Sequence, residues 1–251
     1  MTQHSVDVGA ALADAARAMN RPRDLQQTLN AIVHAAVATL PDFDLVGIST
    51  IHRDGTVQTR AASDDVVWQL DALQYELGEG PCLDAIRDET GPSSFIVEYA
   101  AQERRWPAFI PWAVQIGLKA QLGIQLYDEA EALGFLNLYS TTSETFDAES
   151  YHLADLFATH AALAMGRARR EKQLNEGMAS RKLIGKAIGI TMEHYGIDEE
   201  RAFELLIRAR SSSNIKLRLI AEEVVQLTNA RARGDRRLDG ASSHNGTSSR
   251  N

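Results

Sequence analysis

The sequence contains a single cysteine and no long apolar run. Because Cys82 has no partner, an internal disulfide framework is excluded, and a reducing compartment such as the cytoplasm is expected. No stretch approaches the roughly 18 apolar residues that a membrane-spanning helix needs. The N-terminal stretch has no cationic cluster before its Ala-rich segment and carries Asp7 and Asp14, which is not typical of a secretory signal. We therefore expect a cytoplasmic protein without a membrane anchor.

Motifs of catalysis and metal binding are also missing. There is no Gly-rich phosphate loop, nucleophile elbow or pair of catalytic carboxylates. His52, His152 and His160 lie far apart and have no cysteine partner, so they do not indicate a metal site. Cys82 follows Pro81 near an expected helix start, where a lowered thiol pKa would suit a redox sensor or a thiol enzyme. The alternative is a small buried apolar residue. We expect no enzyme and no cofactor that the sequence identifies.

Charge is divided unevenly along the 251 residues, whose formal net charge is −8. Residues 1–165 hold 9 Lys and Arg against 23 Asp and Glu, whereas residues 166–251 hold 17 against 11. The acidic part would repel a polyanion, and the basic part would attract one through counterion release. The pattern favours an acidic domain followed by a small nucleic-acid-binding module.

The first two thirds of the chain alternate between helix and strand patterns. Apolar spacing predicts two helices within residues 6–40, punctuated by Pro22 and Pro41, and a long helix from Asp147. Apolar, β-branched runs predict strands at residues 45–51, 57–61, 94–97, 118–127 and 133–140, with turns at Asp54-Gly55 and Asp128–Glu131. This order predicts an α+β domain with an antiparallel sheet and helices on its faces.

The long helix becomes sparsely apolar past Met165. Its remaining apolar residues include Leu174 and Met178, too few to fold alone but suited to a short coiled-coil seam between two chains. A solvated linker helix is the alternative. After Asn229 the chain is rich in Gly, Ser and Arg and lacks aromatics, so we expect a disordered tail over residues 231–251.

The spacing of apolar residues within 181–225 predicts three short amphipathic helices, which can bury their apolar stripes only against one another. Gly185 and Gly189 cost about 1 kcal/mol each inside the first helix, which indicates close approach of another helix or of a ligand backbone. Lys216 and Arg218 begin the third helix, where cations oppose the helix dipole. They suit a bound phosphate, although solubilising surface charge is the alternative. The basic residues of the outer faces are Arg181, Lys182, Lys186, Arg208, Arg210, Lys216 and Arg218.

This module resembles the ANTAR domain. The resemblance rests on Arg181, Ile184, Gly185, Ala187, Gly189, Met192, Ala202, Phe203, Leu206, Ser211, Asn214, Lys216, Leu217 and Ala221. It implies a three-helix RNA-binding module that, paired in a dimer, engages two adjacent stem-loops in nascent mRNA and prevents a terminator from forming. Loop bases would be read by stacking and polar contacts. The RNA-binding residues implied are Arg181, Lys182, Lys186, Gly189, Arg210, Ser211, Asn214, Lys216 and Arg218.

One position departs from the family pattern. Ile188 stands where the family often has lysine, and Lys186 replaces a common glutamine two residues earlier. Two helix positions rotate a side chain by about 200°, so Lys186 does not present its charge where that lysine would.

Residues 20–165 resemble a GAF domain, a fold that senses small molecules and mediates dimerisation. The resemblance rests on residues 73–85 and 104–109 and on the order GAF then ANTAR, which recurs in actinobacterial regulators. It implies a sensor, with an unidentified small-molecule or protein signal, joined through residues 166–180 to an RNA-binding domain at 181–230. We expect a homodimeric antitermination regulator. A helix-turn-helix DNA-binding regulator remains an alternative, since that plan also has three helices.

Overall fold

The computed structural model describes residues 2–22, 24–52, 55–87, 94–128, 131–213 and 215–242. The chain divides into two compact units, Met1–Lys172 and Gln173–Asn251. Asp54, Glu129 and Ala130, which belong to two predicted turns, lie outside the described residues.

The first unit is built on a five-stranded antiparallel sheet with the order β2-β1-β5-β4-β3. The strands are β1 (Leu45–Ile51), β2 (Val57–Ala62), β3 (Ser94–Val97), β4 (Ala120–Asp128) and β5 (Glu131–Ser140). The antiparallel sheet and its five strands are confirmed. The interior strands β1, β4 and β5 are almost continuously buried, because helices cover both faces of the sheet.

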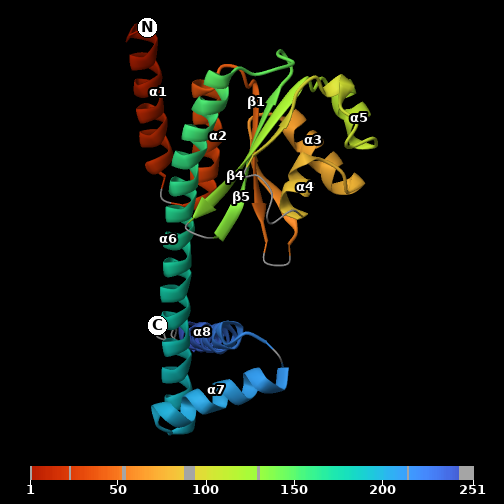
Figure 1. Ribbon diagram of the computed structural model, residues 1–251. Coiled ribbons are helices and arrows are strands. Elements are labelled where there is room, and N and C mark those ends of the chain that lie inside the picture. The colour runs from red at the N-terminus through yellow and green to blue at the C-terminus, as the bar shows by residue number, and fades with distance from the viewer. Residues whose placement is uncertain are drawn as a thin grey trace, which may run out of the picture. The chain divides into compact units, whose positions relative to one another are not determined.

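The helices form one layer on each face of the sheet (Figure 1). One layer contains α1 (Thr2–Asn20), α2 (Leu25–Thr39) and the first part of α6 (Ala148–Tyr195). The other contains α3 (Asp65–Leu77), α4 (Pro81–Arg87) and α5 (Phe109–Ile116), with a short 3-10 turn at Ala100–Gln102. The predicted α+β class, with helices on the sheet's faces, is confirmed.

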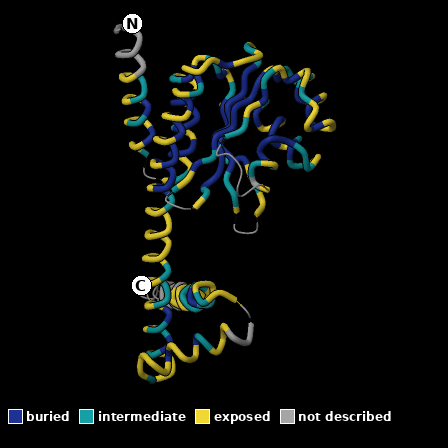
Figure 2. Tube along the Cα trace, viewed as in Figure 1, coloured by how far each residue is buried: buried dark blue, intermediate teal, exposed yellow. Residues whose placement is uncertain are grey.

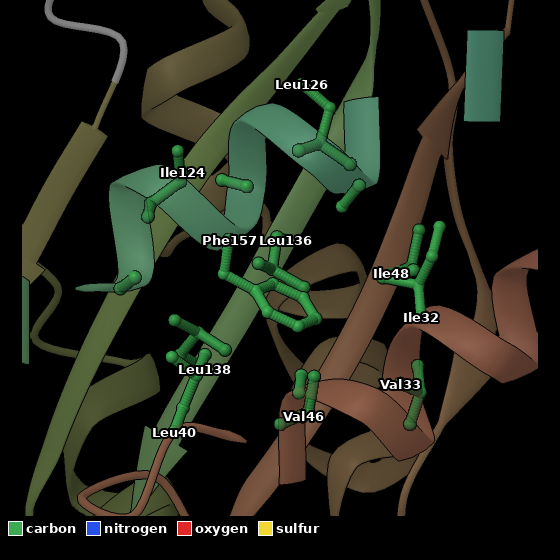
Figure 3. Close-up of a cluster of buried hydrophobic side chains, with 14 of the residues drawn as sticks. Ile32, Val33, Leu40, Val46, Ile48, Ile124, Leu126, Leu136, Leu138 and Phe157 are labelled. Atoms are coloured by element: carbon green, nitrogen blue, oxygen red, sulfur yellow. The ribbon is translucent and has the colours of Figure 1, made fainter. Parts of the chain in front are cut away.

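Local sequence explains where the main helices of this unit begin. Asp24 caps α2 by accepting from the Gln27 N–H at 2.8 Å, and Asp147 accepts from the Ser150 N–H at 2.8 Å at the start of α6. Phe157 of α6 then points toward Leu136 and Leu138 of β5 in the core (Figure 3).

Residues 166–170 hold α6 against the rest of the first unit. Gly166 allows close approach, because a Cβ there would lie 2.5 Å from Oδ2 of Asp128 at the end of β4. The arginine contacts are Arg167 to the Asn20 carbonyl at 2.8 Å, Arg169 to Glu131 at 2.8 Å, and Arg170 to Asp128. The predicted linker therefore begins as a docked segment, with its arginines used within the first unit.

The second unit contains the remainder of α6, α7 (Glu199–Ser213) and α8 (Leu217–Ser242). Its core is small and centres on Ala187, Leu206 and Ala221. The three expected helices are present and pack against one another. Phe203 and Leu205 of α7 are about two-fifths exposed, because the short helices leave room for only a narrow apolar seam.

Helix α8 extends to Ser242, past residue 231 where the tail was expected to begin, and the disorder of the tail stays a prediction. Ala, Arg and Leu favour helix, and no proline follows Pro111 to interrupt it. Residues 243–251 lie outside the described part of the chain. Within the described residues, no helix is both long and apolar enough to cross a membrane.

Candidate nucleic-acid interface and sensor cluster

A basic groove of about 640 Å³ lies in the second unit, between α6 and the start of α8. Four predicted site residues meet there, although about thirty positions of sequence separate the two pairs. The groove is lined by Glu176, Ala179, Ser180, Lys182, Leu183, Lys186, Lys216 and Arg218. The α6 residues recur at helical spacing, so one face of the helix forms a wall of the groove.

The N-terminus of α8 adds the positive end of a helix dipole to these cations. The Lys216 carbonyl accepts from the Leu219 N–H at 2.8 Å, so Lys216 stands where the helix begins. Arg218 lies 3.9 Å from Glu222 in an exposed i,i+4 pair, which is weak in water. A phosphate in the groove would therefore meet four cations and the positive end of α8.

The other predicted site residues lie outside this groove. Arg181, Gly189 and Arg210 are exposed. The side chain of Ser211 and the whole of Asn214 lie outside what the structure describes. Around Gly185 and Gly189 an added Cβ would meet nothing within 4 Å, so neither glycine is needed for packing within the chain.

The first unit contains a buried polar cluster between the sheet and α3. Asp71 is its centre and is fully buried. Its carboxylate accepts from Thr59 Oγ1 at 2.5 Å, from Ser49 Oγ at 3.5 Å and from the Tyr139 hydroxyl. Tyr75 bridges Ser49 and Thr59 at 3.0 and 3.1 Å. The cluster therefore joins β1, β2, β5 and α3 by side chains alone.

No cation contacts Asp71 within the described residues, so no opposite charge offsets the cost of burying its ionised form. Burial raises the pKa of Asp71 to about 6, although hydrogen bonds from Thr59, Tyr139 and Ser49 oppose the rise. Burial and the neighbouring Asp71 also raise the pKa of Tyr139 well above its usual range. Sequence reasoning missed this cluster, although Asp71 and Gln74 stand three apart on an otherwise apolar helix face.

Family comparison decides what the two units are. The GAF domain model matches residues 22–166, more than half of the chain, and the ANTAR domain model matches residues 172–225. The chain belongs to the GAF domain family, and its second unit carries an ANTAR domain. The GAF and ANTAR resemblances are thereby confirmed, and the architecture is that of a sensor joined to a regulatory output rather than of a catalytic protein. No curated protein sequence matches the chain.

Solved structures show the same fold at low identity. The photosensory core module of a Stigmatella aurantiaca phytochrome has a TM-score of 0.58 at 11% identity, covering 80% of this chain and 44% of that one. The Burkholderia cenocepacia LuxR family transcription factor CepR2 has 0.52 at 20%, covering 66% and 99%. The GAF domain of an Acinetobacter phosphoenolpyruvate-protein phosphotransferase has 0.50 at 14%, covering 69% and 99%. At these identities the likeness shows the fold alone.

Cys82 of the GAF domain is not poised for redox chemistry. It is fully buried, and its thiol donates to Oδ1 of Asn137 at 2.9 Å. Burial raises the pKa of the Cys82 thiol well above its usual range, so the expected lowering at a helix start is wrong. The backbone N–H of Cys82 donates to Gln74 Oε1 at 3.2 Å. The other amide atom of this side chain, Gln74 Nε2, is buried and has no hydrogen-bond partner among the described residues. Cys82 is thus buried, as in the alternative of a small buried apolar residue.

Ile188 of the ANTAR domain packs against the cluster of Ala187, Leu206 and Ala221. At this position the side chain belongs to the module's core rather than to its basic surface. The family's frequent lysine is therefore replaced here by an apolar contact, and the groove obtains its charge from other positions.

Proposed function

We propose that this chain is an RNA-binding regulator of transcription antitermination. Its ANTAR domains, paired in a homodimer, bind two adjacent stem-loops in nascent mRNA in the cytoplasm and prevent an overlapping terminator from forming. The GAF domain responds to a small-molecule or protein signal and controls that binding.

The observation that carries this proposal is the basic groove. Lys182, Lys186, Lys216 and Arg218 come from two helices and converge on one concave surface. Scattered solubilising charge has no reason to converge, whereas an RNA backbone needs several cations along one path. The apolar positions Leu183 and Ala179 in the same groove provide a surface against which an unpaired base can stack.

The proposed dimer rests on the exposed apolar residues of α6. Leu174 and Met178 are 68% and 61% exposed and lie four residues apart on one helix face. The middle part of α6 is drawn mostly as exposed in Figure 2. Leu174 and Met178 of α6 in one protomer would pack against the same residues of the partner's α6 as a short coiled-coil seam. Leu174→Glu is expected to shift the protein from dimer to monomer in analytical ultracentrifugation, and to abolish tight binding of tandem but not of single stem-loops. A variant that stays dimeric would contradict the seam.

The two domains share α6, which begins in the GAF domain and forms the first helix of the ANTAR domain. A signal that binds one state of the GAF domain better would shift the population of α6 arrangements. Control of RNA binding then needs only a change in how the two helices of the dimer meet.

The test is binding of the full chain to a tandem stem-loop RNA, beside a scrambled RNA and a DNA duplex, at near-physiological salt. We expect preferential binding of the stem-loops. A clear preference for the duplex would instead favour a helix-turn-helix DNA-binding regulator. The structure speaks against that alternative, because Leu217, Ile220 and Val224 of α8 face the module's core.

Charge variants connect this binding to the groove. Lys182→Ala and Lys216→Ala should each weaken binding to every stem-loop and lower the slope of log affinity against log salt by about 1. Arg201→Ala removes the same charge from an exposed site on α7 outside the groove and is the matched control. Equal effects of all three variants would remove the groove as the interface.

A further inference from the structure

The two faces of the sheet in the GAF domain differ in polarity, although helices cover both. Toward α1, α2 and α6, strand β4 presents the apolar side chains of Ala120, Leu122, Ile124 and Leu126. Toward α3, the sheet presents buried polar side chains beside Tyr139, namely Ser49, Thr59, Gln121 and Asn137. A polar group is costly to bury unless it finds a hydrogen-bond partner, so each of these side chains needs one.

Gln121 is a polar residue of this face whose hydrogen bonds are not satisfied. Ser49, Thr59 and Asn137 are each hydrogen-bonded within the chain. Gln121 is fully buried, yet neither its Oε1 nor its Nε2 has a partner among the described residues. Because buried side-chain amides are nearly always bonded, this carboxamide keeps one acceptor and one donor for a group that the chain does not supply.

Beside Gln121 the sheet forms a slot that already holds a flat ring. Gly123 follows Gln121 on the same face of β4, and Phe95 of the edge strand β3 pairs with it. The Phe95 ring lies directly on the Gly123 backbone, because an added Cβ there would be 1.8 Å from Phe95 Cζ. Phe135 of β5 lies next to it, with ring centroids 6.3 Å apart. A glycine inside a strand is typical of a place where a ligand approaches the backbone closely.

The Phe95 ring can leave this slot without disturbing the sheet. Phe95 is only partly buried and belongs to the edge strand, so rotation about its side-chain bonds moves the ring toward solvent. The space that it vacates is a flat layer over Gly123, next to the carboxamide of Gln121. The side chains around that layer, Gln121, Phe95 and Phe135, carry no charge, so a charged ligand would lose its hydration there without compensation.

We propose, resting on the sensor role of the GAF domain above, that the slot over Gly123 binds an uncharged six-membered heterocycle whose amide edge pairs with Gln121. The ligand ring takes the place of the Phe95 ring. Its N–H donates to Gln121 Oε1, and its adjacent carbonyl accepts from Gln121 Nε2. A side-chain carboxamide makes the same two-bond pairing with the edge of a nucleobase.

The experiment titrates the full chain with two small probes and follows binding by ligand-observed NMR. The first probe is 2-pyridone, a flat ring with an N–H beside a carbonyl. The second is N-methyl-2-pyridone, in which a methyl group replaces the donated hydrogen. Wild type should bind 2-pyridone saturably and prefer it on the order of tenfold, as expected for a two-bond contact.

Three variants connect the preference to the slot. Gln121→Met keeps the length of the side chain but cannot form the pair, so both probes should bind it equally weakly. Gln125→Met is the matched control on the same strand, since the Gln125 carboxamide already accepts from the Tyr127 hydroxyl, and it should keep the preference. Phe95→Ala removes the competing ring and should bind 2-pyridone more tightly than wild type does. This last variant keeps the proposal testable if Gln121→Met does not fold.

Urea unfolding without probe separates a ligand site from a structural amide. Gln121→Met should unfold at the same urea concentration as wild type or at a higher one, because no group in the chain loses a hydrogen-bond partner. A lower unfolding midpoint, with probe binding unchanged, would show that Gln121 serves the fold instead and would overturn the proposal.

Three binding results would also overturn it: no saturable binding of 2-pyridone by wild type and Phe95→Ala, equal affinity of wild type for both probes, or a preference retained by Gln121→Met. These measurements need no RNA, so they stand apart from the stem-loop binding test. If 2-pyridone binds as expected but leaves stem-loop affinity unchanged at saturation, the site stands and the proposed control of RNA binding by this ligand class fails.

Discussion

Asp71 makes a quantitative prediction about how the stability of the GAF domain depends on pH. Its pKa is raised from 3.8 to about 6, mainly because burial disfavours the ionised carboxylate. At about 1.4 kcal/mol for each pH unit, the difference amounts to about 3 kcal/mol. A group whose folded pKa is raised contributes stability that is complete below pH 3.8 and is lost as the pH rises through 6. The native domain should therefore lose about 2 kcal/mol of this contribution between pH 4 and pH 7, since part of it is already lost at pH 4.

The perturbation is Asp71→Asn, which keeps the shape but cannot ionise. Asn also loses one acceptor toward Thr59 or Tyr139, which adds a pH-independent offset to the difference between the variant and wild type. The quantity to follow is the difference in free energy of unfolding between wild type and the variant. It should fall by about 2 kcal/mol from pH 4 to pH 7, with the change centred between pH 4 and 6.

The assay is urea unfolding of the full chain followed by tryptophan fluorescence. All three tryptophans lie at positions 68, 106 and 112, so the signal reports on the first unit alone. Glu76→Gln, which removes an exposed carboxylate from the same helix, is the matched control. A difference between wild type and Asp71→Asn that stays constant across this pH range would refute the reasoning.

Three further predictions follow from packing. Gly185→Ala should stabilise the second unit by about 1 kcal/mol, since its Cβ would meet nothing and alanine favours helix; slower hydrogen exchange in α6 to α8 would show it. Gly166→Ala should destabilise the first unit by about 1–3 kcal/mol, because its Cβ would displace Asp128 from Arg170; tryptophan-monitored unfolding that matches wild type would contradict the close approach. Cys82 should react with a chromogenic aromatic disulfide more slowly in native buffer than in urea, by on the order of a hundredfold, and equal rates would contradict its burial.

The secondary structure of the GAF domain could be predicted closely because its patterns are local. The strands at residues 45–51 and 94–97 were predicted with their observed bounds, since β-branched runs bounded by turn residues need no tertiary information. Helix α6 was predicted to begin near Asp147, whose side chain caps it. Helix α8 extends past residue 231, where the tail was expected to begin, in a stretch where Ala, Arg and Leu favour helix.

The site was predicted only in part. Charge and motif identified Lys182, Lys186, Lys216 and Arg218. Nothing in their spacing could show that the two lysines of α6 and the two cations at the start of α8 line one groove. The Asp71 cluster was missed for the same reason, because four of its members are far apart in sequence and meet only when the sheet forms.

The sequence by itself determined the two-part organisation, the fold class and the change in charge between the halves. These properties follow from composition and from periodicity within a helix or strand, which act over a few residues. The tertiary structure alone decided that Cys82 is buried, that Ile188 packs against the core of the second unit, and that Asp71 is buried with no cation in contact among the described residues. A pKa, a groove or a buried contact depends on the dielectric and on neighbours brought from distant parts of the chain, and these exist only after the chain has folded.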